Sequence, residues 1–510
     1  MNAPFPARPR ASLYGMRYAA VTGHHLASRA AAVRLESGGS LIDAMIAASA
    51  VLTVALPHAT SLGGCAMMLH YHAGRGELTG LNGSGHAPAA ARPGLFPNGI
   101  DPRGPRSWVV PGLVRFWARA HQSHGLLPWR TLFSDAIELA GHGLGFGSEL
   151  ARNLALAGAE VRAQPGFAQA FTENGADRKV GTPWRQPALA ETLRQIAEEG
   201  ETAFYHGDIA RRLACYASEQ GALLTREDLA DSRADWVAPV WQDHGRWQVG
   251  VMPPNSVGVL MQAQLAHLRP AYEQPREERL YAQIVAASRL LPGLRDRVAD
   301  PGAAWPWEET ADGIRPASAG PQRGDPGDTA GIVLADASGN GLAMLQSVFQ
   351  PFGSGCVDPA TGILMNNRLG EFSLTAGQHN LLAPGKRPVH TLNPYVVAAG
   401  GKPALYAVSP GGVSQTTTGV QCLFNALLDD MRLPQAIDAP RWSLSRDGKV
   451  MCEPGFPADV VRRLRERGME VATDSLHPFY FGSVKAVRPL PGGMLEAAAD
   501  LRREACALAW

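Results

Sequence analysis

Runs of apolar residues separated by turn residues divide the chain of 510 residues into helices and strands. The clearest strand pair starts at Thr329, where an aliphatic run to residue 334 is followed by turn residues at 336–341 and a second apolar run at 342–345. Two such runs joined by a short turn rich in Gly and Asn are typical of a β-hairpin. The pattern therefore predicts a hairpin whose first strand begins with a threonine hydroxyl.

The same periodicities predict the other elements. Helical spacing and long apolar runs predict helices at residues 26–36, 41–56, 113–121, 129–140, 188–199, 209–219, 277–291, 416–430 and 458–467. Short aliphatic runs bounded by Gly and Pro predict strands at residues 18–22, 66–72, 78–82, 362–366, 394–399, 404–409 and 483–487. Because strands and helices are mixed rather than strictly alternating, we expect a layered α/β or α+β fold with a largely antiparallel sheet.

The longest apolar run, residues 41–56, predicts a buried helix. It contains Asp43 and stops at Pro57, so it is shorter than the ~20 apolar residues that span a bilayer. Ser40 and Asp43 form a capping-box pattern at its start. We therefore do not expect a membrane partner from this segment.

The composition supports a large folded core. Hydrophobic residues make up 45% of the chain and charged residues 18%, which suits two or more domains or one large, elaborated domain. The 47 Lys and Arg residues are balanced by 46 Asp and Glu residues. Nucleic acid and an anionic membrane surface are therefore not expected as partners.

Cysteine usage and the N-terminus favour the cytoplasm. The six cysteines are scattered without C-x-x-C spacing, so we expect reduced thiols. The first ten residues contain Pro and Arg where a secretory signal needs an apolar stretch. We therefore expect a cytoplasmic protein.

Common metal, nucleotide and serine-hydrolase motifs are missing from the sequence. The histidines at positions 24, 25, 70, 72 and 86 lie in no zinc-binding spacing, and we interpret them as polar turn or strand positions. No Walker-type loop is found. Ser354 lies between Gly353 and Gly355, which is too close for the G-x-S-x-G turn of serine hydrolases. We expect neither a metal nor an organic cofactor.

Thr329 offers a different chemistry, although its hairpin alone is also compatible with an ordinary strand end. If the chain were cut between Asp328 and Thr329, the new α-amino group would lie beside the hydroxyl. Such an amine has a pKa of about 7.7–8.0 and can act as a general base. Residues 305–328 are rich in Pro, Gly, Asp and Arg, and we expect them to form an exposed, flexible segment suited to cleavage.

Several separated stretches together resemble the gamma-glutamyltransferase family of N-terminal-nucleophile hydrolases, whose members are self-cleaving proenzymes. These are residues 26–28 with 38–44, 57–64, 87–89 (Ala-Pro-Ala), 110–112 (Val-Pro-Gly), 327–329 (Gly-Asp-Thr), 366–368 (Asn-Asn-Arg) and 409–412 (Ser-Pro-Gly-Gly). The resemblance implies a four-layer α-β-β-α fold. It also implies a large subunit, residues 1–328, and a small subunit, residues 329–510, interwoven in one catalytic domain.

The resemblance also assigns catalytic roles. Thr329 matches the self-cleaving nucleophile, so the cut falls between Asp328 and Thr329. Gly411 and Gly412 match the glycine pair whose N–H groups form the oxyanion hole, where a missing Cβ allows close approach. Ser347 stands where the transferases have a Thr that holds the nucleophile. The alternative for Ser347 is a strand-end hydroxyl that faces solvent.

The substrate site departs from the family pattern. Ser84 stands where the transferases have an Arg that binds the glutamyl α-carboxylate, and Ser cannot replace that contact. His390 and Thr391 replace a Ser-Ser pair, and Glu371 is the nearest counterpart of the acidic residue that binds the α-amino group. We hypothesise that Arg368, with His390, meets a small anionic amide, as in relatives that hydrolyse oxamate. A structural salt bridge between Arg368 and Glu371 is the alternative.

The resulting prediction is a threonine-nucleophile amidohydrolase or acyltransferase that cleaves an amide of a small acidic substrate through an acyl-enzyme. Two alternatives remain open at this point. One is a true gamma-glutamyl transpeptidase acting on glutathione, and the other is a silent relative that never cleaves and only binds a ligand. A homo-oligomer of the two-subunit unit also stays open.

Overall fold

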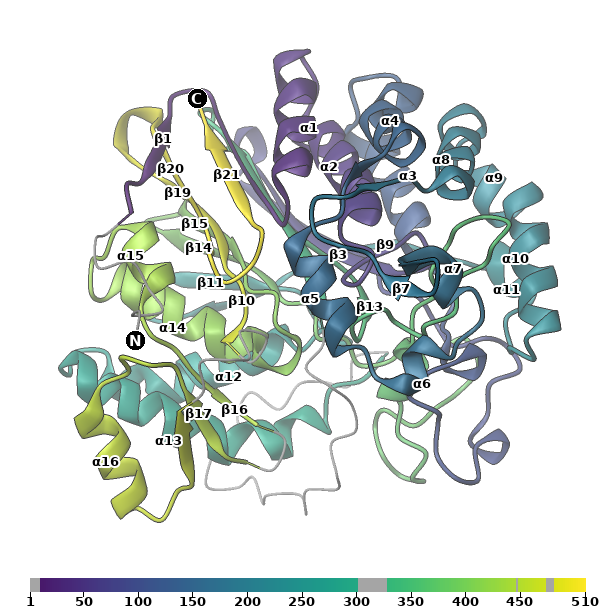
Figure 1. Cartoon of the computed structure of the whole chain (residues 1–510). Helices are drawn as coiled ribbons and strands as arrows, with labels where there is room; N and C mark the ends of the chain where they lie inside the picture. The colour runs from purple at the N-terminus through teal and green to yellow at the C-terminus, as the bar shows by residue number, and fades with distance from the viewer. Residues whose placement is uncertain (1–9, 301–327, 446–447, 474–480) are drawn as a thin grey trace.

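Two seven-stranded sheets lie at the centre of the computed structural model, which describes residues 10–300, 328–445, 448–473 and 481–510 (Figure 1). The first sheet has the order β21-β2-β12-β13-β3-β4-β9. Its strands are Cys506–Ala509, Tyr18–Thr22, Asp328–Asp336, Gly341–Phe349, Cys65–His72, Glu77–Gly83 and Asp235–Val237. All its strand pairs are antiparallel, as predicted.

The second sheet has the order β1-β20-β19-β15-β14-β11-β10 and is also antiparallel throughout. Its strands are Leu13–Gly15, Leu495–Ala499, Lys485–Pro489, Lys402–Val408, Pro394–Ala399, Gln248–Val251 and Val240–Asp243. Side chains of both sheets share one buried cluster, which includes Val333 and Ala335 of β12 with Val408 and Val487 of the second sheet. The two sheets therefore pack face to face through these residues.

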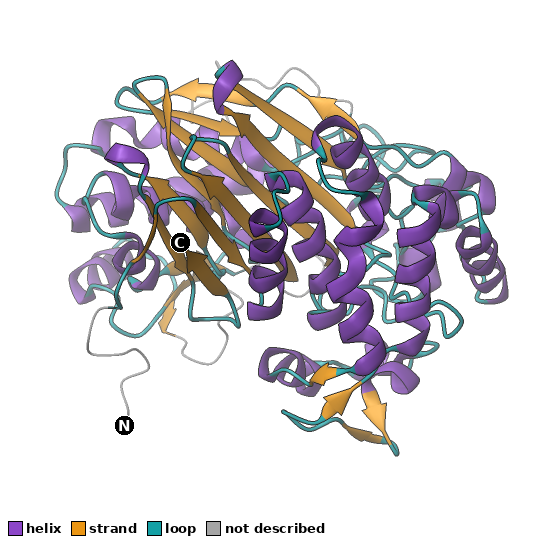
Figure 2. Cartoon of the chain, turned by 90° about the horizontal axis from the view of Figure 1, so that it is seen from above, coloured by secondary structure: helices purple, strands orange, loops and turns teal. Residues whose placement is uncertain are grey.

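Helices cover the outer faces, and Figure 2 shows the strands gathered between helices on both sides. On the first sheet lie α1 (His25–Glu36) and α2 (Leu41–Ala55), joined by α3 (Leu113–His124), α4 (Ser134–His142) and α8 (Pro187–Glu199). On the second lie α12 (Gly258–Leu268), α13 (Arg276–Arg295), α14 (Gln415–Leu427) and α15 (Leu433–Asp438). The mixed α+β class predicted from the sequence is confirmed.

The remaining elements surround this centre. The helices are α5 (Ser148–Leu156), α6 (Ala159–Arg162), α7 (Phe167–Phe171), α9 (Glu201–Tyr205), α10 (Asp208–Glu219), α11 (Arg226–Ala230) and α16 (Ala458–Glu466). A small sheet contains β16 (Trp442–Leu444), β17 (Val450–Cys452) and β18 (Val471–Thr473). Four two-residue strands form two short pairs: β5 (Leu144–Gly145) with β8 (Pro183–Trp184), and β6 (Thr172–Glu173) with β7 (Ala176–Asp177).

Helix α2 is buried along its whole length, and the predicted capping box between Ser40 and Asp43 is present. The Ser40 hydroxyl accepts the N–H of Asp43 at 3.1 Å, while an Asp43 carboxylate oxygen accepts the N–H of Ser40 at 2.8 Å. The box satisfies two N–H groups that the helix start would leave unpaired. No helix within the described ranges has both the length and the apolar character needed to cross a bilayer.

The predicted hairpin is the β12–β13 pair in the middle of the first sheet. Ala330, Ile332 and Leu334 of β12 pack on the helical side, while Val333 and Ala335 face the second sheet. Both faces of the strand are thus buried, which explains its unbroken apolar run. The pairing register shifts between Asp328 and Ala330, so Thr329 lies at an irregularity of the strand.

Three expectations need correction or limits. The strand predicted at residues 362–366 is not a sheet strand: the chain turns into it, with the Gly362 N–H donating to the Asp358 carbonyl at 2.7 Å, and only isolated bridges follow at Leu364 and Met365. The predicted helix at residues 129–140 is divided into a 3₁₀ turn, Trp129–Phe133, and α4. The flexible segment predicted up to residue 328 lies outside the described residues except for Asp328, which is fully buried.

Candidate active site

The peptide bond between Asp328 and Thr329 is buried, and its carbonyl oxygen accepts hydrogen bonds from two hydroxyl groups. The Thr329 hydroxyl donates to the carbonyl oxygen of Asp328 at 2.7 Å, and the Ser347 hydroxyl donates to the same oxygen at 2.7 Å. Ser347 is 1% exposed, so the solvent-facing alternative for its hydroxyl is wrong. The structure therefore brings together the predicted nucleophile, the predicted cleavage site and Ser347.

The Asp328 side chain lies in a charged cluster that the sequence reasoning missed. Its Oδ1 accepts the Thr329 N–H at 2.8 Å and is paired with the Arg503 guanidinium. Its Oδ2 lies 3.4 Å from His58 Nε2, which is also 3.6 Å from a carboxylate oxygen of Glu149. Arg503 Nε is 3.9 Å from the same Glu149 oxygen. We call His58, Glu149, Asp328 and Arg503 the cleavage-site cluster.

Electrostatics in the cleavage-site cluster favour an ionised Glu149 carboxylate. Burial by itself raises the pKa of Glu149, but His58 and Arg503 outweigh it and hold that pKa well below its ordinary value. His58, Glu149 and Asp328 offer donor atoms within 4.8 Å of one another, a spacing that a metal ion could use. The Arg503 guanidinium already lies against both carboxylates. This guanidinium supplies the positive charge that a metal ion would otherwise supply, so this donor set does not require a metal.

Gly411 and Gly412 lie in a loop that packs on the start of β12. A Cβ at Gly331 would lie 2.7 Å from Val408 Cγ2 and 3.2 Å from Pro410 Cγ, so only glycine allows this approach. A Cβ at Gly411 would lie 2.6 Å from the Cα of Gly482. Pro410, which precedes the two predicted oxyanion-hole residues, thus packs on β12, and Gly411 packs on Gly482.

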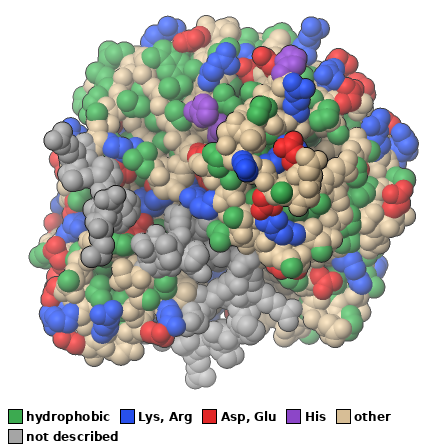
Figure 3. Space-filling view, in the orientation of Figure 1, with side chains coloured by type: hydrophobic (Ala, Val, Ile, Leu, Met, Phe, Trp, Pro, Cys, Tyr) green, Lys and Arg blue, Asp and Glu red, His purple; other side chains and the backbone are tan. Residues whose placement is uncertain are grey.

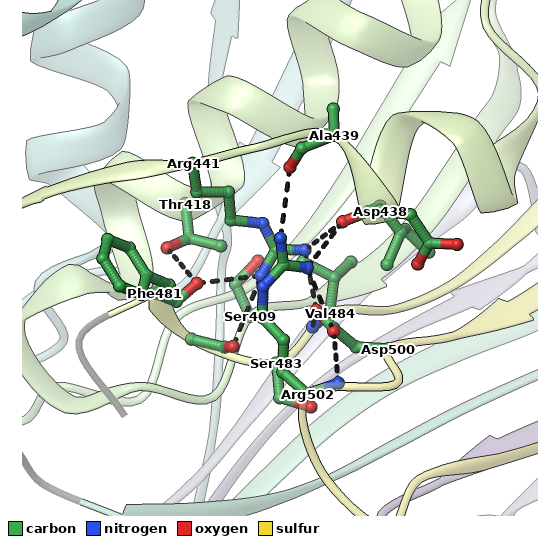
Figure 4. A network of polar contacts seen from close by, with 12 residues as sticks. Ser409, Thr418, Asp438, Ala439, Arg441, Phe481, Ser483, Val484, Asp500 and Arg502 are labelled. Atoms are coloured by element: carbon green, nitrogen blue, oxygen red, sulfur yellow. Dashed lines mark hydrogen bonds and ion pairs between the residues drawn. The ribbon is translucent and has the colours of Figure 1, made fainter. Parts of the chain in front are cut away.

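A buried polar network supports this loop (Figure 4). Arg441 donates to the carbonyl of Phe481 at 2.8 Å and pairs with Asp500 at 2.7 Å, while Asp500 also accepts the Val484 N–H at 2.9 Å. The Ser483 N–H donates to the Pro410 carbonyl at 2.6 Å. These bonds connect the ion pair to the residue that precedes the glycine pair.

Lys485 is the next charged residue along β19. It pairs across the sheet with Val408, and paired residues point to the same face, so its side chain is directed between the two sheets. Its ammonium donates to the Ser483 hydroxyl at 2.7 Å. Burial, followed by the charge of Arg503, lowers the pKa of Lys485 to about 8.

Arg368 is a buried cation that forms no salt bridge with a described carboxylate, although the charge of Glu371 acts on it from a distance. It is 0% exposed, and its guanidinium lies 3.4 Å from the Thr391 hydroxyl and 4.3 Å from the centre of the Phe349 ring. Its Nε and Nη2 atoms are buried and form no hydrogen bond with the described residues. Burial lowers the pKa of Arg368 to about 10, so it remains charged at neutral pH.

His390 and Ser84 lie in the same buried region. His390 Nε2 has no hydrogen-bond partner, and burial together with Arg368 lowers the pKa of His390 well below its ordinary value. Asn255 joins the two residues: its side chain donates to the Ser84 hydroxyl at 3.1 Å, and its carbonyl accepts the His390 N–H at 2.8 Å. We call Arg368, His390, Thr391 and Ser84 the arginine pocket.

Glu371 is directed to another partner. Its carboxylate pairs with Arg295 at 2.7 Å, so the alternative of a salt bridge between Arg368 and Glu371 is wrong. Cys65, another neighbour of Arg368, supplies no negative charge, because burial raises the pKa of its thiol to about 11. The charge of Arg368 is thus left without a carboxylate contact.

Phe349 connects the two regions. It pairs with Asp328 across the hairpin, its N–H donates to the Ser347 hydroxyl at 2.8 Å, and its ring lies under the Arg368 guanidinium. Its φ angle of +86° is rare for a residue with a side chain. Phe349 therefore links Arg368 to Ser347 and Asp328, the residues around the Asp328 carbonyl.

The face of the molecule in Figure 3 shows the described Lys and Arg side chains interspersed with Asp and Glu. This agrees with a formal net charge of +1.

Comparison with known proteins covers nearly the whole chain. Residues 27–510 match the family model described as Gamma-glutamyltranspeptidase. The oxamate amidohydrolase proenzyme of Klebsiella pneumoniae is 33% identical over 523 residues, which cover 97% of this chain and 98% of the relative. The glutathione hydrolase-like YwrD proenzyme of Bacillus subtilis is 30% identical over 524 residues, which cover 98% and 99%.

A solved structure agrees with these sequence matches. The cephalosporin acylase from Bacillus halodurans superposes with a TM-score of 0.89 at 29% identity, over 100% of this chain and 98% of the acylase. The matched proteins are hydrolases and acylases, and the two sequence relatives are described as proenzymes.

Proposed function

The chain belongs to the gamma-glutamyltranspeptidase family of enzymes, and on this premise we propose that it is a self-processing amidohydrolase with Thr329 as its nucleophile. One observation carries the proposal: the hydroxyl groups of Thr329 and Ser347 both donate to the carbonyl oxygen of Asp328. A hydroxyl so close to a carbonyl needs little movement to attack it. Cleavage there gives a large subunit, residues 1–328, and a small subunit, residues 329–510.

The proposed fold is the four-layer α-β-β-α arrangement of N-terminal-nucleophile hydrolases. Three buried clusters support it: one between the two sheets and one between each sheet and its helices. In this arrangement β12 is a central strand, and its first residue after cleavage is Thr329. A central strand gives the nucleophile a rigid support.

The proposed reaction on a substrate has two steps. The α-amine of Thr329 takes the hydroxyl proton, Oγ attacks the substrate amide, and the amine product leaves with that proton. Water then hydrolyses the ester on Thr329. The N–H groups of Gly411 and Gly412 stabilise the oxyanion in both steps.

The proposed substrate class is the amide of a small carboxylic acid. Arg368 supports it, because a buried guanidinium with two unpaired donor nitrogens lacks a carboxylate that a substrate can supply. Thr391 and neutral His390 complete the arginine pocket. The 33% identical relative is described as an oxamate amidohydrolase, and oxamate is a small carboxylate amide.

A gel with purified protein tests the self-processing. Wild-type chain should separate into two pieces, with the smaller piece starting at Thr329 on N-terminal sequencing, while Thr329→Ala should stay whole. Thr329→Ser keeps a hydroxyl and should still be cut. A wild-type chain that stays whole and inactive would exclude the mechanism and favour a ligand-binding relative.

A substrate panel tests the acid amide. Oxamate should release ammonia faster than a γ-glutamyl anilide releases its aniline, because Ser84 replaces the arginine that holds a glutamyl α-carboxylate. Comparable turnover of both substrates would favour the gamma-glutamyl transpeptidase alternative. Adding a second amine as acceptor separates hydrolysis from transfer.

A further inference from the structure

The carboxylate of Asp328 contacts the nitrogen that must leave when the chain is cut. Its Oδ1 accepts the Thr329 N–H at 2.8 Å, and the carbonyl of the same residue accepts the hydroxyl of Thr329. Asp328 thus touches the leaving nitrogen with its side chain and the nucleophile with its main chain. Both contacts lie in a site that is closed to solvent.

Self-cleavage needs a proton carrier that the mature enzyme does not need. Before the cut, the nitrogen of Thr329 is an amide and cannot serve as a base. The proton of the Thr329 hydroxyl must nevertheless reach that nitrogen, since an unprotonated amide nitrogen is a poor leaving group. Among the described groups that contact this nitrogen, the Asp328 carboxylate can hold a proton.

We propose that Asp328 is a catalytic residue for self-cleavage, carrying the proton from the Thr329 hydroxyl to the leaving nitrogen, and that His58 and Arg503 position its carboxylate. This inference rests on the proposed self-processing at Thr329 and adds the group that performs the first proton transfer. It concerns the intact chain, because the cut separates Asp328 from the nucleophile.

Self-cleavage passes through an ester between the Thr329 hydroxyl and the Asp328 carbonyl carbon. The Oγ–C bond forms as Oγ attacks the carbonyl carbon of Asp328, the hydroxyl proton moves to the Asp328 carboxylate, and the Ser347 hydroxyl stabilises the oxyanion. The carboxyl group returns the proton to the Thr329 nitrogen, and the C–N bond breaks. Water then hydrolyses the ester, giving the α-carboxylate of Asp328, a free α-amine and the restored hydroxyl.

The surrounding charges suit a carboxylate that changes protonation. The Arg503 guanidinium pairs with Oδ1 of Asp328, and His58 Nε2 is 3.4 Å from Oδ2. Glu149 faces His58 from α5, and Lys485 acts on the site from β19. His58 is fully buried, and neither ring nitrogen makes a hydrogen bond of good geometry to a described residue, although Nε2 lies 3.4 Å from Asp328. A buried histidine placed in this way suits a role in positioning the Asp328 carboxylate.

The test measures how fast freshly synthesised full-length chain becomes two pieces, by gel and intact mass. Asp328→Asn keeps the shape but not the charge, and cleavage should slow by roughly 100-fold or more. Asp328→Glu keeps a carboxylate and should cleave faster than Asp328→Asn. Asp336→Asn, at the far end of the same strand, is the matched control and should cleave at the wild-type rate.

The pH profile separates chemistry from structure. Wild-type cleavage should slow as pH falls, because a protonated carboxyl cannot accept the hydroxyl proton, and Asp328→Asn should lose this acid limb. His58→Leu removes the polar ring that lies 3.4 Å from the carboxylate, so cleavage should slow while its acid limb remains. His58→Gln keeps a polar side chain at this position and should restore the cleavage rate toward the wild type.

Two outcomes overturn the inference. One is wild-type cleavage by Asp328→Asn, and the other is equal slowing of the Asn and Glu variants at every pH. Thermal unfolding of each variant shows that a slow chain is still folded, with the Glu variant as the second measurement if the Asn variant is not. A wild-type chain that is never cut rejects the proposed function itself, which is a separate result.

Discussion

Two buried arginines near the same peptide bond differ in what they face. Arg503 lies against the carboxylates of Asp328 and Glu149. Arg368 lies against a hydroxyl and an aromatic ring, with two donor nitrogens unpaired. A buried charge is tolerated when it is paired and is costly when it is not. Arg503 therefore belongs to the internal structure of the intact chain, whereas Arg368 suits a carboxylate brought by a ligand.

The largest expected effect is the loss of Arg503. Arg503→Met leaves the carboxylates of Asp328 and Glu149 buried without their cation, so the free energy of unfolding should fall by about 3–5 kcal/mol. Denaturant unfolding in the Thr329→Ala background measures it on a chain that stays whole.

The matched control is Arg29→Met. The Arg29 side chain is 67% exposed and pairs with Asp135 at 3.1 Å, so its loss should change the free energy of unfolding by at most about 1 kcal/mol. Equal effects of the two substitutions would remove the distinction between a paired buried arginine and an ordinary surface one.

The second prediction concerns Ser347, whose hydroxyl forms hydrogen bonds with Asp328, the partner of Arg503, and with Phe349, the neighbour of Arg368. Ser347→Ala removes a donor from the Asp328 carbonyl oxygen, and self-cleavage should slow by roughly 100- to 1,000-fold. A time course of subunit formation measures the rate. Ser347→Thr keeps the hydroxyl and should cleave close to the wild-type rate; if it is as slow as Ala, packing rather than hydrogen bonding decides.

The third prediction uses pH to probe Lys485. Burial lowers its pKa from 10.5 to about 8, so between these values the unfolded chain holds a proton that the folded chain lacks. Stability should therefore rise with pH across this window, by an amount on the order of 3 kcal/mol. Unfolding of the Thr329→Ala chain at several pH values measures the slope.

Lys485→Met should abolish that slope, and Lys402→Met should keep it, because Lys402 is exposed. An unchanged slope in Lys485→Met would assign the pH dependence to other groups.

The smallest expected effect is on binding in the arginine pocket. Arg368→Met should raise the KM for oxamate by about 10- to 100-fold, since a charge-assisted hydrogen bond contributes about 1.5–3 kcal/mol. The free energy of unfolding should stay unchanged or rise, because an unpaired buried charge is removed. Steady-state kinetics and denaturant unfolding measure the two effects.

Arg289→Met on α13 is the control for a general loss of an arginine, and its KM should match the wild type. An unchanged KM in Arg368→Met would argue against a carboxylate at this position. A large loss of stability would place Arg368 in the same class as Arg503.

Local patterns predicted the long elements of the fold well. Helix α2, its capping box and the β12–β13 hairpin were all predicted, because apolar runs and caps act over a few neighbouring residues. Strands β9 to β11 were not predicted. They are three or four residues long, and their pairing with distant strands rather than their own pattern makes them strands.

The candidate site divides in the same way. Thr329, Ser347, Gly411 and Gly412 could be proposed from motif resemblance, and the structure places their segments together. His58, Glu149 and Arg503 belong to no shared local pattern, since they come from three distant parts of the chain. Only His58 had a signal, as part of the Pro57-His58 stretch that resembles the family.

By itself, the sequence indicated that Thr329 lies at the start of a strand and that Ser84, His390 and Thr391 replace the binding residues expected from the family. Only the tertiary structure decided which charges meet. Glu371, three residues from Arg368, pairs with Arg295 on α13, while Asp328 finds Arg503 from the end of the chain. The reason is physical: the energy of a charge depends on its burial and on its partners, and both are set by contacts between distant segments.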